Sequence, residues 1–198
     1  IAGAVAFSVV LVALMLARTL IGLGICSGIL GVIYAMGKQD CKRMLAYSSI
    51  ENIGIILIGC GLGLLGVVSG KPLMALLGFC GGLLHVCNHA LFKSLLFLAA
   101  GSVLHATGTR ESDQLGGLIK TLPVTGRCFL TGSVAIAGLP PLNGFVSEFL
   151  IYFAGFLGLT LPGLDMLFAI AALLALASIG GLASACFAKV VGIVFLGE

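Results

Sequence analysis

The sequence predicts an all-α protein, a polytopic transmembrane helix bundle with about six spans. Hydrophobic residues make up 60% of the chain and charged residues only 9%, and the mean hydropathy is +1.26. A water-soluble domain does not need so much apolar surface. The apolar residues also form runs close to the ~20 residues that cross a bilayer as a helix. The basic residues lie between these runs and not on one patch, so nothing favours nucleic acid as a partner.

Six apolar segments are expected to cross the lipid bilayer, within a single transmembrane domain that covers residues 1–198. They are residues 1–17, 20–36, 44–68, 73–104, 124–157 and 165–195. The fourth would be about 48 Å long at ~1.5 Å per residue, so it is expected to tilt or project. Asp165 is expected to cap the last one. Because both ends of the chain lie at apolar runs, we expect a fragment of a longer chain.

The distribution of lysine and arginine predicts the orientation in the membrane. The loops on one side hold Lys38, Lys42, Arg43, Arg110, Lys120 and Arg127, and the other side holds Lys71 and Arg18. Short loops rich in these residues stay on the cytoplasmic side. The loops at residues 37–43 and 105–127 are therefore predicted to be cytoplasmic.

Three ionisable residues in the fourth span form the leading candidate site. His85, His89 and Lys93 recur every four residues, so a helix places them on one face over roughly 12 Å. Ionisable groups at bilayer depth usually face a bundle interior or a water path. They are therefore predicted to transfer protons. The alternatives are a purely structural role, or a metal site at the two histidines, for which the sequence offers no third ligand and no HExxH motif.

A break is expected in the middle of the fifth span. Pro140 and Pro141 have no backbone N–H, and Gly138 and Gly144 loosen the chain on either side. Transporters often build ion sites at such discontinuous helices. Glu148 follows one turn later, where the helix end would favour its charged form and burial its neutral form, so it is predicted to change charge during a cycle. The alternative is a kinked helix whose carboxylate reaches the surface.

Glu51, early in the third span, is a candidate accessory group. It either pairs with a cation of a neighbouring span or lies near the membrane interface. The seven cysteines are scattered without a CxxC pair, which predicts apolar packing and not a metal or cluster site. No cofactor is therefore expected in this chain.

Four motifs carry a resemblance to a known family. They are KRMLAYSS at residues 42–49, HxxxHAxFKxLLFLxxGSV at 85–103, LGGL at 115–118 and AGLPPLNGFVSE at 137–148. In this order they resemble the antiporter-like membrane subunits of respiratory complex I, Mrp-type cation/proton antiporters and membrane-bound hydrogenases. Within the family, residues 49–54 and the last motif are most similar to hydrogenase-4 component B and formate hydrogenlyase subunit 3. The resemblance covers about residues 20–198.

The resemblance implies two inverted five-helix repeats, each with one discontinuous helix. This chain would be the second repeat with one preceding apolar segment. By match, protons would pass through Lys93, His89, His85 and Glu148, with Glu51 as an accessory. The protein would lie in a prokaryotic inner membrane, with other membrane subunits and peripheral hydrogenase or dehydrogenase subunits as partners. Nickel–iron and iron–sulfur sites would lie in those partners, so the chain would be non-catalytic with no redox site of its own.

The predicted function is proton translocation in a redox-driven complex, of the hydrogenase-4, formate hydrogenlyase or NADH-quinone oxidoreductase type. One alternative is an Mrp-type sodium/proton antiporter subunit, driven by an ion gradient. Another is a truncated, purely structural membrane fragment. The buried lysines that the family's first repeat carries are not found in residues 1–17, which keeps this last alternative open.

Overall fold

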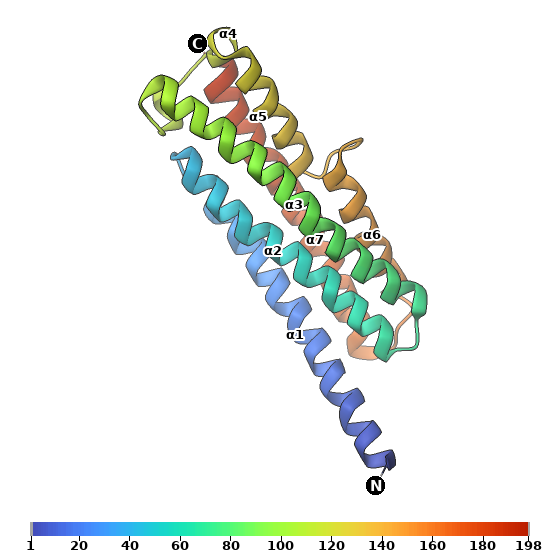
Figure 1. Cartoon of the computed structure of the whole chain (residues 1–198). Helices are drawn as coiled ribbons and strands as arrows, with labels where there is room; N and C mark the ends of the chain where they lie inside the picture. Colours follow the sequence, from blue (N-terminus) through green and yellow to red (C-terminus); the bar gives the residue numbers. More distant parts are fainter. Residues whose placement is uncertain (1, 198) are drawn as a thin grey trace.

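The computed structural model describes residues 2–197, and side chains from residue 7 onwards; residue 1, where the first predicted span begins, lies outside this range. The α-helices are α1 (Ala2–Met36), α2 (Cys41–Val68), α3 (Pro72–Thr107), α4 (Leu118–Thr121), α5 (Pro123–Ile136), α6 (Asn143–Gly158) and α7 (Gly163–Val191). A 3₁₀ turn, η1 (Ser112–Gln114), and a π-helical turn, η2 (Gly192–Leu196), follow α3 and α7. The long helices lie along one common direction (Figure 1). Within the described residues, α1, α2, α3 and α7 are long and apolar enough to cross a membrane, which confirms the all-α polytopic prediction.

The first long helix, α1, is unbroken, so the boundary expected between spans 1–17 and 20–36 is wrong. The Arg18 guanidinium binds the Asp165 carboxylate of α7, at 2.8 Å from one nitrogen and 2.9 Å from another. The Thr19 hydroxyl donates to a carbonyl one turn earlier in α1 at 2.8 Å. Because both polar side chains have partners, neither opens the helix. The first apolar segment is therefore the N-terminal half of α1, and not a separate span that precedes the repeat.

The last long helix, α7, starts slightly earlier than predicted. It begins at Gly163 with Pro162 in the N-cap position, so the expectation that Asp165 caps this helix is wrong. The carboxylate lies in the first turn and is turned towards α1, where Arg18 binds it. An acidic side chain in the first turn still meets the positive end of the helix. The ion pair between Arg18 and Asp165 therefore joins the start of α7 to α1, at the end of the bundle opposite the loops at residues 37–43.

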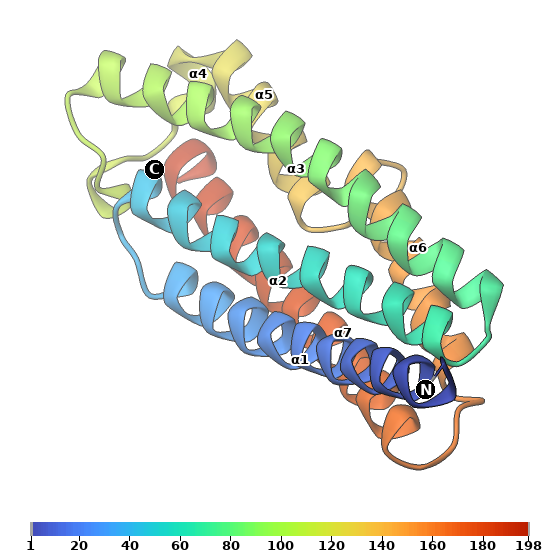
Figure 2. The same cartoon turned by 60° about the horizontal axis from the view of Figure 1, so that its bottom comes forward.

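The fifth predicted span, 124–157, consists of two helices, α5 and α6, with a short break between them. Gly138 lies in the break with φ 64°, a conformation that glycine adopts readily and other residues rarely. Pro140 and Pro141 follow in a turn, joined by a cis peptide bond. Both half-helices pack on α3, and together they follow it along the bundle (Figures 1 and 2). The predicted discontinuous helix is therefore present.

Glycines bring α1 and α2 into close contact. A Cβ atom built on Gly54 of α2 would lie 2.5 Å from the carbonyl oxygen of Gly24 in α1. A Cβ atom on Gly31 of α1 would lie 2.5 Å from the backbone nitrogen of Glu51. Small residues are how membrane helices approach each other this closely. As a result, the backbone of α1 covers Glu51.

The two loops that were predicted to share one side of the membrane meet at one end of the bundle. The Cys41 backbone N–H donates to the Arg110 carbonyl at 3.0 Å. The Asp40 carboxylate accepts two backbone N–H groups at the start of α2 and lies 3.6 Å from the Arg110 guanidinium. The segment at 105–127 is not an open loop, because the end of α3, η1, α4 and the start of α5 fall within it. We refer to this end as the loop end.

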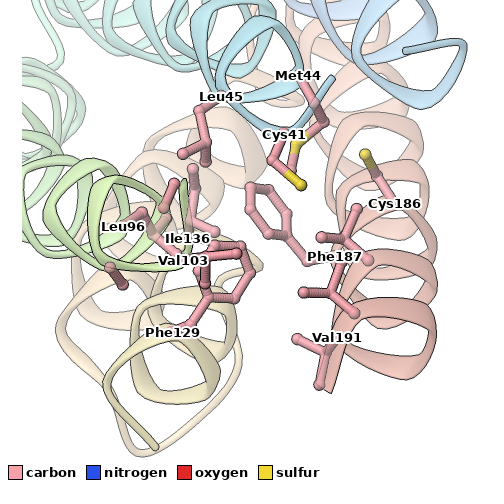
Figure 3. Close-up of a cluster of buried hydrophobic side chains, with 14 of the residues drawn as sticks. Cys41, Met44, Leu45, Leu96, Val103, Phe129, Ile136, Cys186, Phe187 and Val191 are labelled. Atoms are coloured by element: carbon pink, nitrogen blue, oxygen red, sulfur yellow. The ribbon is translucent and has the colours of Figure 1, made fainter. Parts of the chain in front are cut away.

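Two clusters of apolar side chains fill the bundle, one in each half. The cluster at the loop end joins α2, α3, α5 and α7, and Figure 3 shows Phe129, Phe187 and their neighbours meeting there. The other cluster joins α1, α2, α3, α6 and α7 around Ile58 and Leu176. Along α2, the first cluster ends at Leu45 and the second begins at Ile55.

A layer of buried polar side chains separates the two clusters. Its members are Ser48, Glu51 and Asn52 of α2, His85, Asn88 and Lys93 of α3, and Ser147 and Glu148 of α6. Buried polar groups are costly unless they find hydrogen-bond partners. This polar layer is therefore the part of the molecule whose contacts most need an explanation.

Candidate functional site

His85, predicted from the sequence, lies at the centre of the polar layer and is fully buried. Its Nε2 lies 3.0 Å from Asn52 Oδ1 in α2, and its Nδ1 lies 2.9 Å from Ser147 Oγ in α6. Both ring nitrogens therefore face protein groups. One histidine thus links α3 to the helix on either side of it.

The amide of Asn52 determines which hydrogen His85 carries. Asn52 Nδ2 donates to the Ser48 carbonyl at 2.7 Å, so its Oδ1 is the atom that faces the histidine. An amide oxygen only accepts hydrogen bonds, so His85 Nε2 must bear a hydrogen. The proton that His85 gains or loses is therefore the one at Nδ1, on the side of Ser147.

The Ser147 hydroxyl can serve both charge states of His85. Ser147 Oγ lies 2.9 Å from Nδ1 and also 2.9 Å from the Gly144 carbonyl oxygen. When His85 is neutral, the hydroxyl donates to Nδ1. When His85 is charged, Nδ1 donates to Ser147 Oγ and the hydroxyl turns to Gly144. Because a hydroxyl both donates and accepts, the proton can come and go without leaving a buried group unpaired.

Asn88 extends the network to the break in the discontinuous helix. Its Nδ2 donates to Ser147 Oγ at 3.0 Å and to the Asn143 carbonyl at 2.8 Å. Asn143 Nδ2 donates back to Asn88 Oδ1 at 3.1 Å. Since Asn143 is the first residue of α6, this pair fixes the start of the half-helix relative to α3.

Lys93 binds a serine hydroxyl of α2, just as His85 binds a serine hydroxyl of α6. Its Nζ donates to the Leu45 carbonyl at 2.7 Å and to Ser48 Oγ at 2.5 Å, and the residue is only 6% exposed. The Ser48 hydroxyl also lies 3.1 Å from the Leu45 carbonyl. A charged Lys93 donates to Ser48 Oγ, and a neutral amine accepts from the same hydroxyl. Each titratable nitrogen thus faces a serine whose other partner is a carbonyl three residues earlier.

His89 lies between these two residues on α3 but joins neither set of contacts. It is half-buried, and its Nε2 is buried with no hydrogen-bond partner in the described part of the chain. Its ring meets the Phe92 ring edge-on, with centroids 5.7 Å apart. Of the three residues predicted to share one helix face, His85 and Lys93 contact α2, whereas His89 Nε2 has no hydrogen-bond partner among residues 2–197.

Glu148 follows Ser147 on α6 and packs against the break. A Cβ atom built on Gly138 would lie 2.5 Å from Glu148 Oε2, so the glycine leaves room for the carboxylate. Gly144, expected in the break, lies instead in the first turn of α6, against the end of α5. Because α6 starts at Asn143, Glu148 lies past the free N–H groups of the first turn. The helix-end effect expected from the sequence is therefore weak at this carboxylate.

A groove of about 670 Å³ lies beside Glu148, between α6 and α7. One wall is aromatic and consists of Phe145, Phe149, Phe153 and Phe156 of α6. Small residues of α7, among them Gly180 and Gly181, line the opposite wall. Glu148 is 9% exposed, so this residue of the polar layer reaches the edge of an opening on the outside of the bundle.

Glu51 is buried between the two apolar clusters, with 1% of its surface exposed. Glu51 therefore lies inside the bundle and not on its surface. Neither carboxylate oxygen has a hydrogen-bond partner among residues 2–197. Glu51 lies one helical turn from Ser48, which binds Lys93. A buried carboxylate without a partner costs several kcal/mol, and a role in packing alone does not explain it.

Sequence reasoning alone does not single out the neutral members of the polar layer. Ser48, Asn52, Asn88 and Ser147 make most of its hydrogen bonds. Each lies three or four residues from a titratable or polar residue within an apolar span, or directly beside one. Polar residues at helical spacing inside apolar spans are the signal that would have found them.

A metal site finds no support in this arrangement. No group of three or more His, Cys, Asp or Glu residues that could hold a metal lies within the described residues. Both ring nitrogens of His85 face Asn52 and Ser147, so the pair formed with His89 is not turned towards a shared ion. The described cysteines form no disulfide.

Most of the chain matches one known protein family. The family described as "NADH:quinone oxidoreductase/Mrp antiporter, TM" matches residues 2–175. The chain belongs to this family. Every member of the polar layer falls inside the matched range, so the antiporter-like resemblance predicted from the four motifs is confirmed.

Curated relatives of this antiporter-like chain belong to hydrogenase and antiporter systems. It is 46% identical over 180 residues to formate hydrogenlyase subunit 3 of Escherichia coli (strain K12), covering 90% of this chain and 29% of that protein. It is 42% identical over 182 residues to hydrogenase-4 component B of the same strain, covering 88% and 26%. It is 37% identical over 138 residues to a subunit of the Na(+)/H(+) antiporter of Alkalihalophilus pseudofirmus, covering 68% and 17%. The chain thus spans less than a third of these relatives.

A solved structure shares the fold. The Mrp complex from Dietzia sp. DQ12-45-1b contains a chain that superposes with a TM-score of 0.75 at 26% identity, over 92% of this chain and 30% of that chain. The antiporter-like chain is an integral membrane protein, and it is similar to proteins of multi-subunit membrane complexes.

Proposed function

We propose that this chain is part of a proton-translocating membrane subunit in a redox-driven complex, of the hydrogenase-4 or formate hydrogenlyase type. Protons move through Lys93, His89, His85 and Glu148. The observation that carries the proposal is the polar layer across α2, α3 and α6, in which two titratable nitrogens each face a reversible serine hydroxyl. The identity to formate hydrogenlyase subunit 3 supports the choice of complex.

We infer the proton steps from the contacts in the polar layer. A proton that reaches neutral Lys93 bonds to Nζ, and the Ser48 hydroxyl turns from Nζ to the Leu45 carbonyl. A proton that reaches His85 bonds to Nδ1, and the Ser147 hydroxyl turns in the same way. His89 lies between them on α3, its Nε2 has no hydrogen-bond partner within the described residues, and it is the residue through which a proton passes from one to the other.

Charge repulsion gives the steps an order. Lys93 and His85 are eight residues apart on one helix, which is about 12 Å along the axis. Two positive charges at ~12 Å repel by roughly 1.4 kcal/mol at an effective dielectric constant of ~20. A proton on one residue therefore disfavours a proton on the other by about tenfold. Each transfer thus biases the next.

Glu148 and Glu51 have different roles in the proposed proton transfer. Glu148 exchanges protons with groups that border the α6–α7 groove, because it lines that groove and is 9% exposed. Glu51 is the accessory group, which offers a negative charge one turn from the serine that binds Lys93. The driving charge comes from partner subunits, where the nickel–iron and iron–sulfur sites lie.

The proposal also includes an orientation of the chain in the membrane and a set of partner subunits. The loop end carries most lysine and arginine residues, so we place the loops at 37–43 and 105–127 in the cytoplasm and the chain in a prokaryotic inner membrane. Other membrane subunits and peripheral hydrogenase or dehydrogenase subunits are its partners.

Donor-driven proton uptake by inverted membrane vesicles tests the proposal, with the full-length protein in its own complex. The variant Glu148→Gln keeps the shape of the side chain and removes the charge change. We expect it to oxidise the electron donor while proton uptake falls at least tenfold. The matched variant Glu111→Gln, at the loop end and outside the polar layer, is expected to keep both. Proton uptake at the wild-type level in Glu148→Gln would contradict the proposal.

An Mrp-type sodium/proton antiporter subunit is the second candidate. It is favoured by the identity to the Na(+)/H(+) antiporter protein of Alkalihalophilus pseudofirmus and by the likeness to the Mrp complex. Sodium-driven proton movement in the same vesicles, without an electron donor, would support it. A purely structural role is the third, and it predicts that substitutions of His85, His89, Lys93 and Glu148 all leave transport unchanged.

A further inference from the structure

A pocket of about 360 Å³ lies at the loop end, on the outside of the bundle and apart from the polar layer. It is lined by Lys38, Arg43, Ala46, Tyr47 and Ile50, from the α1–α2 turn and the first turns of α2. Lys38 Nζ lies 5.1 Å from the centre of the Tyr47 ring. Its volume equals roughly twelve water molecules at ~30 Å³ each, enough for a polar headgroup.

Two cations face this pocket without a bound carboxylate. Within residues 2–197, the ion pairs are Arg18–Asp165 and Arg110–Asp40. Asp40, the acid nearest in sequence to Lys38 and Arg43, already accepts two backbone N–H groups besides binding Arg110. The pocket therefore favours an anion.

The surface next to the pocket on the membrane side is apolar. Ile50 is the pocket residue farthest along α2, and it is 45% exposed. Ile53 lies about one turn farther along the same helix and is 48% exposed. A small inorganic anion would use only the cations. A ligand with a charged head and an apolar tail would use both parts of this surface.

We propose that this pocket binds an anionic phospholipid. The phosphate lies between Lys38 and Arg43, and an acyl chain follows Ile50 and Ile53 along α2. Tyr47 forms an amphipathic wall at the depth of the headgroup, where tyrosine is favoured. Basic pockets between transmembrane helices on the cytoplasmic side bind such headgroups, and each cation contributes about fivefold to affinity. The proposal does not depend on proton translocation.

Native mass spectrometry of the full-length protein, extracted with its complex in mild detergent, tests this site. The probes are phosphatidylglycerol and phosphatidylcholine with matched acyl chains. The double variant Lys38→Gln/Arg43→Gln is expected to lower the affinity for phosphatidylglycerol by about 25-fold. The double variant Lys120→Gln/Arg127→Gln removes the same charge at the same end but outside the pocket, and is expected to retain it. Binding of phosphatidylcholine is expected to be the same in all variants.

A further double variant that keeps both positive charges distinguishes loss of lipid binding from misfolding. The variant Lys38→Arg/Arg43→Lys is expected to keep phosphatidylglycerol binding. Equal phosphatidylglycerol affinity in the two glutamine double variants would overturn the proposal. So would inorganic phosphate that displaces the lipid as well as a short-chain phosphatidylglycerol does, because the site would then recognise the free ion. A photoreactive residue at Ile50 that captures a protein segment instead of lipid would also overturn it.

Discussion

Ser147 Oγ lies 2.9 Å from His85 Nδ1 and 2.9 Å from the carbonyl oxygen of Gly144, so one hydroxyl has two competing partners across the α3–α6 interface. Ser48 has the same relation to Lys93 and the Leu45 carbonyl across the α2–α3 interface. A fixed donor or acceptor in either place would suit only one charge state. Each serine hydroxyl can therefore keep a hydrogen bond to its titratable partner in both charge states, so His85 and Lys93 can change charge without a rearrangement of the helices.

Removal of the Ser147 hydroxyl tests this relation. Ser147→Ala leaves neutral His85 without a donor at Nδ1, which costs about 1 kcal/mol or more, so we expect proton uptake to fall roughly tenfold and its pH profile to shift. Ser147→Thr retains the hydroxyl and is expected to recover most of the rate. Ser178→Ala, which removes an exposed hydroxyl bonded only to its own helix, is the control. Alanine and threonine variants with identical pH profiles would show that the hydroxyl has no such role.

Gly138 leaves space for the Glu148 carboxylate, and alanine would fill it. The added Cβ would lie 2.5 Å from Oε2, at a φ of 64° that alanine adopts only with strain. Gly163→Ala is the matched control, because its φ is 58° and nothing lies within 4 Å of its Cβ position. Both variants should lose about 1 kcal/mol of stability in thermal unfolding. Only Gly138→Ala should also lose proton uptake, and equal uptake in both would contradict the placement of Glu148.

Glu51 should be dispensable for stability but not for transport. Because neither of its oxygens has a hydrogen-bond partner among residues 2–197, Glu51→Gln breaks no observed hydrogen bond and replaces an ionisable group that is costly to bury, so we expect the unfolding temperature to stay the same or rise. Proton uptake should fall, since the negative charge near Lys93 is lost. A lower unfolding temperature with full proton uptake would identify Glu51 as a structural residue.

The ion pair between Arg18 and Asp165 should matter for stability alone. It joins α1 to α7 at 2.8 Å, with both side chains partly buried. Asp165→Asn should cost on the order of 1–3 kcal/mol, between the values for exposed and buried pairs. Asp113→Asn in the η1 turn is the control. Thermal unfolding of the full-length protein measures the effect, and a change in proton uptake without a change in stability would contradict this assignment.

The sequence was sufficient for the fold class and for the discontinuous helix. Length and apolarity alone identify membrane helices, and Gly138, Pro140 and Pro141 mark the break directly. Hydropathy predicts the end of a span at Arg18, and this prediction is wrong because α1 continues through it. Its partner Asp165 lies 147 residues away in the sequence, and hydropathy along the chain does not reveal such a pair.

The candidate site was predictable in its charged residues and not in its neutral ones. His85 and Lys93 stand out because a charge is expensive in a bilayer. Asn52 and Ser147 do not stand out, because serine and asparagine also occur in membrane helices as plain packing contacts. Whether a carboxylate such as Glu51 is paired depends on the helix that packs over it, which only the tertiary structure reveals.

The substitution Lys93→Met tests the central claim most directly. Methionine nearly matches the length of lysine and keeps the packing against α2, but it cannot carry a proton. In the full-length protein within its native complex, we predict normal assembly and normal donor oxidation, with donor-driven proton uptake reduced at least tenfold. Lys42→Met, on the first turn of α2 and outside the polar layer, should behave as wild type. Proton uptake at the wild-type level in Lys93→Met would contradict the account.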